Sequence, residues 1–180
     1  DAGALSWEDE RIVAPTEVYD PTRHGALSHE RVRAGAQSVA HGYVHDDNAF
    51  VMGGVAGHAG LFGTAEAVLE VARGWLELRI PGLDRDVRDA FWGWSSTLDS
   101  PRKLGWDGVS PDGTGSTGRA IHPSSVGHLG FTGCSLWIDP NARAIYILLT
   151  NRVHPSRGDV AGIRALRRSF HVSATRGHGC

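Results

Sequence analysis

The segment from Phe131 to Asn151 restricts the possible folds more than any other part of the chain. Residues 131–138 (FTGCSLWI) show an alternating pattern of polar and apolar residues, and some of them are aromatic or β-branched. Residues 143–151 (RAIYILLTN) are nearly all residue types that favour strands. The sequence DPNA lies between them at residues 139–142 and is typical of a turn. The pattern therefore predicts two antiparallel strands joined by a tight turn.

Three further segments are predicted to be helical. Residues 64–80 form an amphipathic pattern that begins with Thr64 as N-cap and ends before a Pro-Gly pair. A short helix is expected over residues 84–92. A longer helix is expected over residues 159–170, and its apolar residues on one side are Val160, Ile163, Leu166 and Phe170. With a short strand near residues 103–106, this order of elements favours an α+β fold with an antiparallel sheet.

The beginning of the chain gives weaker patterns. Residues 1–48 are polar and contain prolines, so they are expected to be mostly loop, with short helical pieces around residues 28–40. Residues 49–63 (AFVMGGVAGHAGLFG) contain five glycines. Because glycine loses much conformational freedom in a regular element, this run is expected to form a compact loop.

The 180 residues are enough for one domain with its own core. We expect a single domain that is incomplete at its N-terminal side, with a loop and helical region at residues 1–92. Residues 93–180 are expected to supply the later sheet strands and the C-terminal helix. Since the chain starts with Asp1 and not with methionine, we expect it to begin inside a longer protein. It carries no recognisable export signal, so the compartment stays open.

Composition and charge point to no nucleic-acid or membrane partner. The net charge is −2, which gives no reason to expect nucleic acid or an anionic membrane as a partner. Residues 164–170 (RALRRSF) contain three arginines, which are read as a solvated helix face, with a basic binding patch as the alternative. The two cysteines, Cys134 and Cys180, do not form a disulfide framework or a zinc-binding pattern.

Two short motifs have competing interpretations. The run GGVAGHAG at residues 53–60 lacks the lysine of a phosphate-binding loop, so we expect a packed loop in which His58 is hydrogen-bonded. Residues 45–48 (HDDN) could contribute metal ligands only with partners from elsewhere. The alternative is that His45, Asp46 and Asp47 cap turns and brace the neighbouring loop.

The segment His128-Leu129-Gly130 is an unusual way to begin a strand. Glycine at position 130 lets another group approach the strand edge closely, and His128 lies on the same side of the strand, two residues earlier. Such an edge could pair with an extended substrate and offer a backbone N–H group as an oxyanion donor. A histidine packed in the core is the alternative that these residues leave open.

The longer strings around this segment carry a family resemblance. GHLGFTGCSLWIDP and ILLTNRVHP, together with VHDDNAFVMGGVAGHAGLFGTAEAV and IVAPTE, resemble the serine β-lactamase-related family. This family includes class C β-lactamases, penicillin-binding-protein-like peptidases and esterases. The resemblance covers residues 12–170. It implies part of a β-lactamase/transpeptidase-like fold, in which helices flank an antiparallel sheet.

The resemblance also implies a set of site residues. His128-Leu129-Gly130 stands where the family has Lys-Thr-Gly or His-x-Gly, so His128 would support proton transfer and Gly130 would line the substrate. The backbone N–H of Phe131 would be an oxyanion donor. Asn151 and Arg152 would lie near a substrate carboxylate, or would simply end a strand. The family's chemistry implies no metal and no other cofactor.

The family's nucleophile motifs are absent from the printed sequence. There is no Tyr-x-Asn, and the only Ser-x-x-Lys spacing is Ser100 to Lys103, which follows the glycine-rich loop and so stands in the wrong order. We therefore expect the C-terminal part of a serine hydrolase that is inactive alone and lacks the N-terminal portion of its own domain. The alternative is a non-catalytic binding or scaffold homologue with a retained cleft.

The substrate is predicted only as a class. An ester, an amide or D-amino-acid peptide such as peptidoglycan, and a β-lactam are all compatible with an acyl-serine mechanism. The His-x-Gly form of the motif favours an esterase or a D-amino-acid peptidase over a true β-lactamase.

Overall fold

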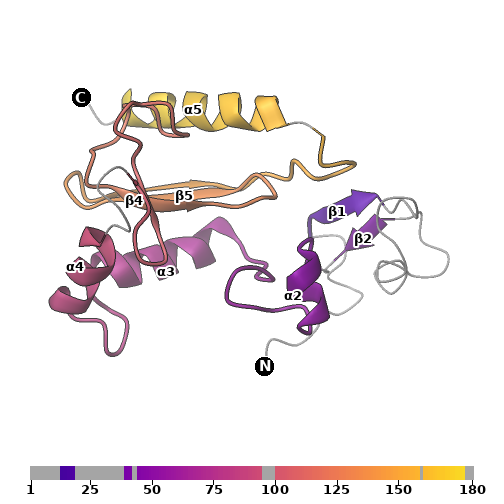
Figure 1. The fold of residues 1–180 in the computed structure, drawn as a ribbon, viewed down its shortest axis with the longest axis horizontal. Coiled ribbons are helices and arrows are strands. Elements are labelled where there is room, and N and C mark those ends of the chain that lie inside the picture. The colour runs from indigo at the N-terminus through magenta and orange to yellow at the C-terminus, as the bar shows by residue number, and fades with distance from the viewer. Residues whose placement is uncertain (1–12, 19–38, 42–43, 95–99, 159, 177–180) are drawn as a thin grey trace. The chain divides into compact units, whose positions relative to one another are not determined.

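The computed structural model divides the chain into two compact units. It describes residues 13–18, 39–41, 44–94, 100–158 and 160–176 (Figure 1). The first unit comprises residues 1–63 and 151–160, and the second comprises residues 64–150 and 161–180. The predicted domain limits at residues 92 and 93 stay a prediction.

A four-stranded antiparallel sheet forms the centre of the second unit. Its strands lie in the order β3 (Asp107–Gly108), β4 (Val126–Leu129), β5 (Ser135–Asp139) and β6 (Ala144–Leu148). Trp137 of β5 pairs with Tyr146 of β6. The Asp139 carboxylate accepts the N–H groups of Asn141 and Ala142, both at 2.9 Å, and so stabilises the turn. The predicted hairpin is therefore confirmed.

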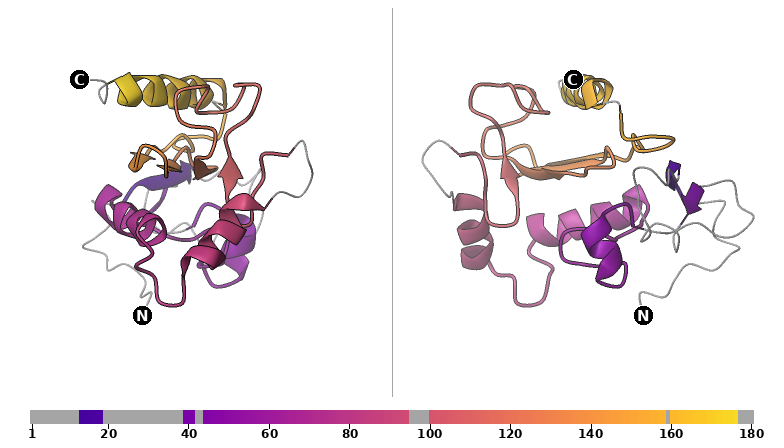
Figure 2. Two further views of the ribbon diagram at one scale, coloured as in Figure 1. Left: turned by 90° about the vertical axis from the view of Figure 1, so that its left-hand side faces the viewer. Right: turned by 45° about the vertical axis from the view of Figure 1, so that its right-hand side comes forward.

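Helices cover both faces of this sheet. Helices α3 (Ala65–Leu76) and α4 (Arg85–Gly93) lie on one face, and α5 (Val160–Arg176) lies on the other (Figures 1 and 2). Thr64 accepts the N–H of Ala67 at 3.3 Å, and Asp84 accepts the N–H of Val87 at 2.8 Å. These N-caps confirm the predicted starts of both helices, and the layers confirm the α+β fold with an antiparallel sheet flanked by helices.

Two apolar clusters fix these layers. Ala72 and Leu76 of α3 pack with Val126 and Ile138 of the sheet, and tryptophans surround this cluster: Trp75, Trp92 and Trp106. On the other face, Trp137, Tyr146 and Ile121 are joined by Phe170 and Ala174 of α5. Successive residues of a strand point to opposite faces, which is why Trp137 and Ile138 belong to different clusters.

The inward face of α5 differs from the prediction. The buried residues of this helix are Ile163, Arg167 and His171, while Val160 and Leu166 are exposed. The helix also continues to Arg176 and does not end near Phe170. The reading of all three arginines as a solvated face is wrong for Arg167. This residue lies one helical turn after Ile163 and one turn before His171, so it is on the same face of α5 as these two buried residues.

The short strand predicted before β4 also needs correction. The strand expected at residues 103–106 lies at Asp107–Gly108, and residues 103–106 form a turn in which Lys103 N–H donates to Trp106 O at 2.8 Å. Gly105 adopts a φ of +73° in this turn, a conformation that favours glycine.

The first unit contains more regular structure than the sequence predicted. Strands β1 (Pro15–Val18) and β2 (Val39–His41) pair antiparallel, and helix α2 (Asp47–Val51) enters the glycine-rich run. The pairing of β1 with β2 joins segments far apart in the chain, which local patterns do not reveal. The rest of the glycine-rich run is a tight loop, since a Cβ on Gly60 would lie 2.2 Å from Gly54 O. Of the helical pieces predicted around residues 28–40, residues 28–38 lie outside the described residues, and residues 39 and 40 belong to strand β2 and not to a helix.

A fully buried histidine links α5 to the sheet. His171 contacts the rings of Trp137, Tyr146 and Phe170 edge-on, with centroid distances between 5.1 and 6.4 Å. Neither ring nitrogen has a hydrogen-bond partner among the described residues. Burial, with a further contribution from the Arg167 charge, lowers the pKa of His171 to about 4.

We expect His171 to make the stability of the protein sensitive to acid. The unfolded chain has a histidine pKa of about 6.5, so it binds the proton more readily than the folded state at pH values between about 6.5 and 4. Stability should therefore fall by about 2 kcal/mol between pH 7 and pH 5 from this group alone. Thermal unfolding of the natural protein and of His171→Phe at both pH values measures the effect. An identical pH dependence in the two proteins would contradict it.

Candidate active-site segment

His128 occupies an accessible position on β4. The strand runs from Val126 to Leu129, with its first two residues buried and His128 exposed. His128 pairs with Leu136 on β5. An exposed imidazole at the end of a short strand is available to a ligand, so the alternative of a core histidine is wrong.

The turn after β4 carries the predicted oxyanion donor. The turn is closed by two hydrogen bonds, from Gly130 N–H to Cys134 O at 2.8 Å and from Gly133 N–H to Gly130 O at 3.0 Å. Phe131 stands in this turn, and the residue is 57% exposed. His128, Gly130 and Phe131 are thus brought together at one end of the β4–β5 hairpin.

The two glycines that flank His128 have different roles. A Cβ on Gly127 would lie 2.3 Å from the ring of Trp137 and 2.4 Å from Leu136 O, so packing requires glycine there. A Cβ on Gly130 would come no closer than 3.4 Å to the Cβ of Cys134. Packing within the protein therefore does not require glycine at position 130. The absence of a side chain there leaves space in which a ligand can approach the strand.

Arg167 is the residue near this segment that the sequence interpretation missed. It is 7% exposed, and its guanidinium donates to three carbonyl oxygens of the turn. Its Nη2 atom lies 2.7 Å from Gly130 O and 2.8 Å from Cys134 O, and its Nε atom lies 3.1 Å from Gly133 O. The only available signal was the helical spacing of Arg167 between Ile163 and His171.

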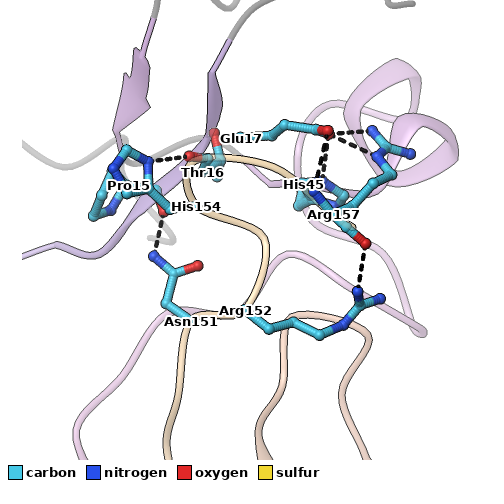
Figure 3. A network of polar contacts seen from close by, with 8 residues as sticks. All are labelled: Pro15, Thr16, Glu17, His45, Asn151, Arg152, His154 and Arg157. Atoms are coloured by element: carbon cyan, nitrogen blue, oxygen red, sulfur yellow. Dashed lines mark hydrogen bonds and ion pairs between the residues drawn. The ribbon is translucent and has the colours of Figure 1, made fainter. Parts of the chain in front are cut away.

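Asn151 and Arg152 belong to the first unit, whereas His128, Gly130 and Phe131 belong to the second. The Asn151 amide donates to Pro15 O at 2.6 Å, and Arg152 Nη1 donates to Arg157 O at 2.8 Å (Figure 3). These bonds connect the segment after β6 to β1 and to its own loop. The role of the two residues towards a substrate remains a proposal.

A buried acidic group organises the first unit. The Glu17 carboxylate is contacted by Arg157 Nε at 2.7 Å and by His45 Nε2 at 3.1 Å (Figure 3). Burial lowers the pKa of His45 although the bond to Glu17 opposes this effect, and the bond to Glu17 raises the pKa of Arg157. Because a buried carboxylate is costly without charged partners, these contacts tie β1 to the loop that contains Arg157.

The HDDN motif has a capping function. Asp46 accepts the N–H of Ala49 at 2.8 Å as N-cap of α2, and His58 Nε2 contacts the same carboxylate at 3.0 Å. These two bonds lower the pKa of Asp46, the bond from Ala49 most strongly. Among the described residues, no group of three or more His, Cys, Asp or Glu side chains could hold a metal ion. The interpretation of this motif as a brace for its loop fits these contacts.

Ser100 and Lys103 do not form a nucleophile pair of the family type. Neither residue lies in a helix, and Ser100 Oγ accepts the N–H of Arg102 at 3.2 Å. A Ser-x-x-Lys pair needs one turn of helix to bring its side chains onto the same face.

None of the described helices is long and apolar enough to cross a membrane.

A shallow groove of about 400 Å³ lies elsewhere in the second unit. Its lining comes from α3, β6 and α5 and includes Glu66, Ile145 and Phe170. None of the predicted site residues lines this groove. The chemistry of the candidate site therefore rests on the β4–β5 hairpin and not on this groove.

Comparison with known proteins identifies the family. The sequence profile of the Beta-lactamase family matches residues 7–169, which is most of the chain. The chain therefore belongs to the Beta-lactamase family, and the resemblance carried by its motifs is confirmed.

Two curated proteins illustrate how similar the chain is to known relatives. A curated Escherichia coli (strain K12) protein named "Putative D-alanyl-D-alanine carboxypeptidase" is 32% identical over 153 residues, which are 82% of this chain and 34% of the relative. A protein of the same name from Salmonella agona (strain SL483) is 32% identical over 147 residues, which are 79% of this chain and 33% of the relative. The chain thus spans about a third of the length of these relatives. No solved structure matches it.

Proposed function

We propose that this chain is the C-terminal part of a serine hydrolase and supplies one side of its acyl-transfer site. The observation that carries the proposal is the accessible His128 directly before the turn that contains Phe131, in a chain of the Beta-lactamase family. In this proposal His128 assists proton transfer and the backbone N–H of Phe131 stabilises the oxyanion. Gly130 leaves space for the substrate beside the strand.

The proposed reaction has two steps. A serine outside the 180 residues attacks the substrate carbonyl, loses its proton to a neighbouring base and forms a tetrahedral oxyanion. The oxyanion collapses with departure of a protonated amine or alcohol and leaves an acyl-serine. Water then attacks the acyl carbonyl and releases a carboxylic acid and the free serine. The N–H of Phe131 acts in both steps, because each passes through an oxyanion.

The name of the relatives favours a D-amino-acid peptide as the substrate. Such a peptide, like peptidoglycan stems, ends in a carboxylate. Arg152 and Asn151 are proposed to lie near that carboxylate, since a guanidinium binds carboxylates well. Esters and β-lactams react by the same steps, so they serve as probes of the mechanism.

Covalent labelling tests the proposed function. The natural protein, incubated with a penicillin or a fluorophosphonate, should gain the mass of one acyl or phosphonyl group in an intact-mass measurement. Residues 1–180 alone should gain none, because their one Ser-x-x-Lys pair, Ser100 and Lys103, does not lie in a helix. If the natural protein forms no adduct with either reagent, the non-catalytic scaffold replaces the hydrolase.

A further inference from the structure

The guanidinium of Arg167 is the one buried charged group that contacts the turn between β4 and β5 in the described part of the second unit. Its Nε and Nη2 atoms donate hydrogen bonds to the carbonyl oxygens of Gly130, Gly133 and Cys134, with nitrogen–oxygen distances of 2.7 to 3.1 Å. Arginine presents five N–H donors in a rigid plane, so it can satisfy several carbonyls at once. The three carbonyls consequently point towards α5.

The direction of the Gly130 carbonyl determines the direction of the Phe131 N–H. Both groups belong to the same peptide unit, which is planar and trans. In a trans peptide the C=O and N–H bonds point in opposite directions. Gly130 O accepts hydrogen bonds from Gly133 N–H within the turn and from Arg167 on α5. Because the bond to Arg167 directs this oxygen towards α5, the N–H of Phe131 is turned away from α5.

The same hydrogen bond also strengthens the donor. A cation that hydrogen-bonds to a carbonyl polarises the peptide, and polarised chains of hydrogen bonds reinforce one another. Arg167 is only 7% exposed, so water screens this effect little. The N–H of Phe131 therefore carries more positive charge than it would beside a solvated carbonyl.

We propose that Arg167 is a positioning residue for acyl transfer: it orients and polarises the peptide unit whose N–H, at Phe131, stabilises the oxyanion. This inference rests on the proposed function. Arg167 acts through the peptide and does not contact the substrate. Through Arg167, helix α5 on one face of the sheet influences the chemistry at the end of β4.

Arg167→Met in the natural protein tests the inference, because methionine keeps much of the length and loses every donor. We expect the acylation rate constant per titrated active site to fall by about 10- to 100-fold, which is at or just below the effect of losing one oxyanion donor. The inhibition constant of a boronic acid, whose adduct is tetrahedral, should rise by a similar factor. The dissociation constant of the substrate before acylation should stay nearly unchanged.

Arg168→Met is the matched control. Arg168 is the next residue of α5 and also donates to carbonyls, those of Gly113, Thr114 and Gly115, but these belong to a different loop. Its loss should leave the acylation rate unchanged. Arg167→Lys provides a second variant if the methionine variant does not fold, and it should retain an intermediate rate because one ammonium group cannot reach three carbonyls with the same geometry.

The possible results separate the two proposals. If the natural protein is acylated and Arg167→Met or Arg167→Lys reacts at the same rate per active site, the inference is overturned and the proposed function stands. A merely structural role would lower the melting temperature and the active fraction without changing that rate, and it would also overturn the inference. Equal slowing in Arg168→Met would do the same. If the natural protein is not acylated, the proposed function fails and this inference fails with it.

Discussion

Replacing His128 by alanine is expected to slow turnover of a chromogenic ester or cephalosporin by the natural protein by about 100-fold. The imidazole is exposed at the end of β4, and Phe131 follows three residues later. Removal of a group that assists proton transfer should lower kcat more than it changes substrate binding. Steady-state kinetics at several pH values measure the effect.

His122→Ala is the control for this experiment. His122 is also an exposed histidine and precedes β4 in the chain, but its Nδ1 atom contacts Ser124 Oγ at 2.7 Å in a local turn. Its removal should leave turnover nearly unchanged. Equal rates for His128→Ala and the natural protein would remove His128 from the site.

Replacing Gly127 by alanine is expected to destabilise the protein by about 3 kcal/mol, at the upper end of the usual cost of overpacking. The added Cβ would meet the Trp137 ring and the Leu136 carbonyl at 2.3 and 2.4 Å. The carbonyl belongs to the paired strand and cannot move without disturbing the β4–β5 ladder. Chemical denaturation of the natural protein and the variant gives the difference in the free energy of unfolding.

Gly130→Ala is the comparison for stability. Its Cβ would meet its neighbours only at 3.4 Å or more, and this glycine does not have a positive φ. The expected change in unfolding free energy is below about 0.5 kcal/mol. A similar loss of stability in both variants would show that the contact with Trp137 does not explain the requirement for Gly127.

The sequence predicted those parts of the fold that depend on neighbouring residues. The hairpin of β5 and β6 follows from strand-forming residues on both sides of a turn sequence, and the N-cap Thr64 marks the start of α3. His128, Gly130 and Phe131 could be selected because their motif is local as well. The structure places them at one end of one hairpin.

Features that depend on distant contacts could not be predicted. Arg167 and His171 are polar in type, so the periodic pattern of apolar residues placed Ile163 and Phe170 correctly on the inward face of α5 but missed these two and wrongly included Val160 and Leu166. Their burial depends on the carbonyls of a turn and on aromatic rings that come from other parts of the chain. The requirement for Gly127 likewise depends on Trp137, which is its partner across the ladder.

A crystal structure of the natural protein with a boronic acid bound to its nucleophile would show directly whether the Phe131 N–H is the oxyanion donor. We expect one boronate oxygen to lie about 2.7–3.1 Å from the backbone nitrogen of Phe131, with His128 beside the adduct. Gly130 O should still accept a hydrogen bond from Arg167. A boronate oxygen bound by other donors, with the β4–β5 turn away from the adduct, would show that Phe131 is not the oxyanion donor.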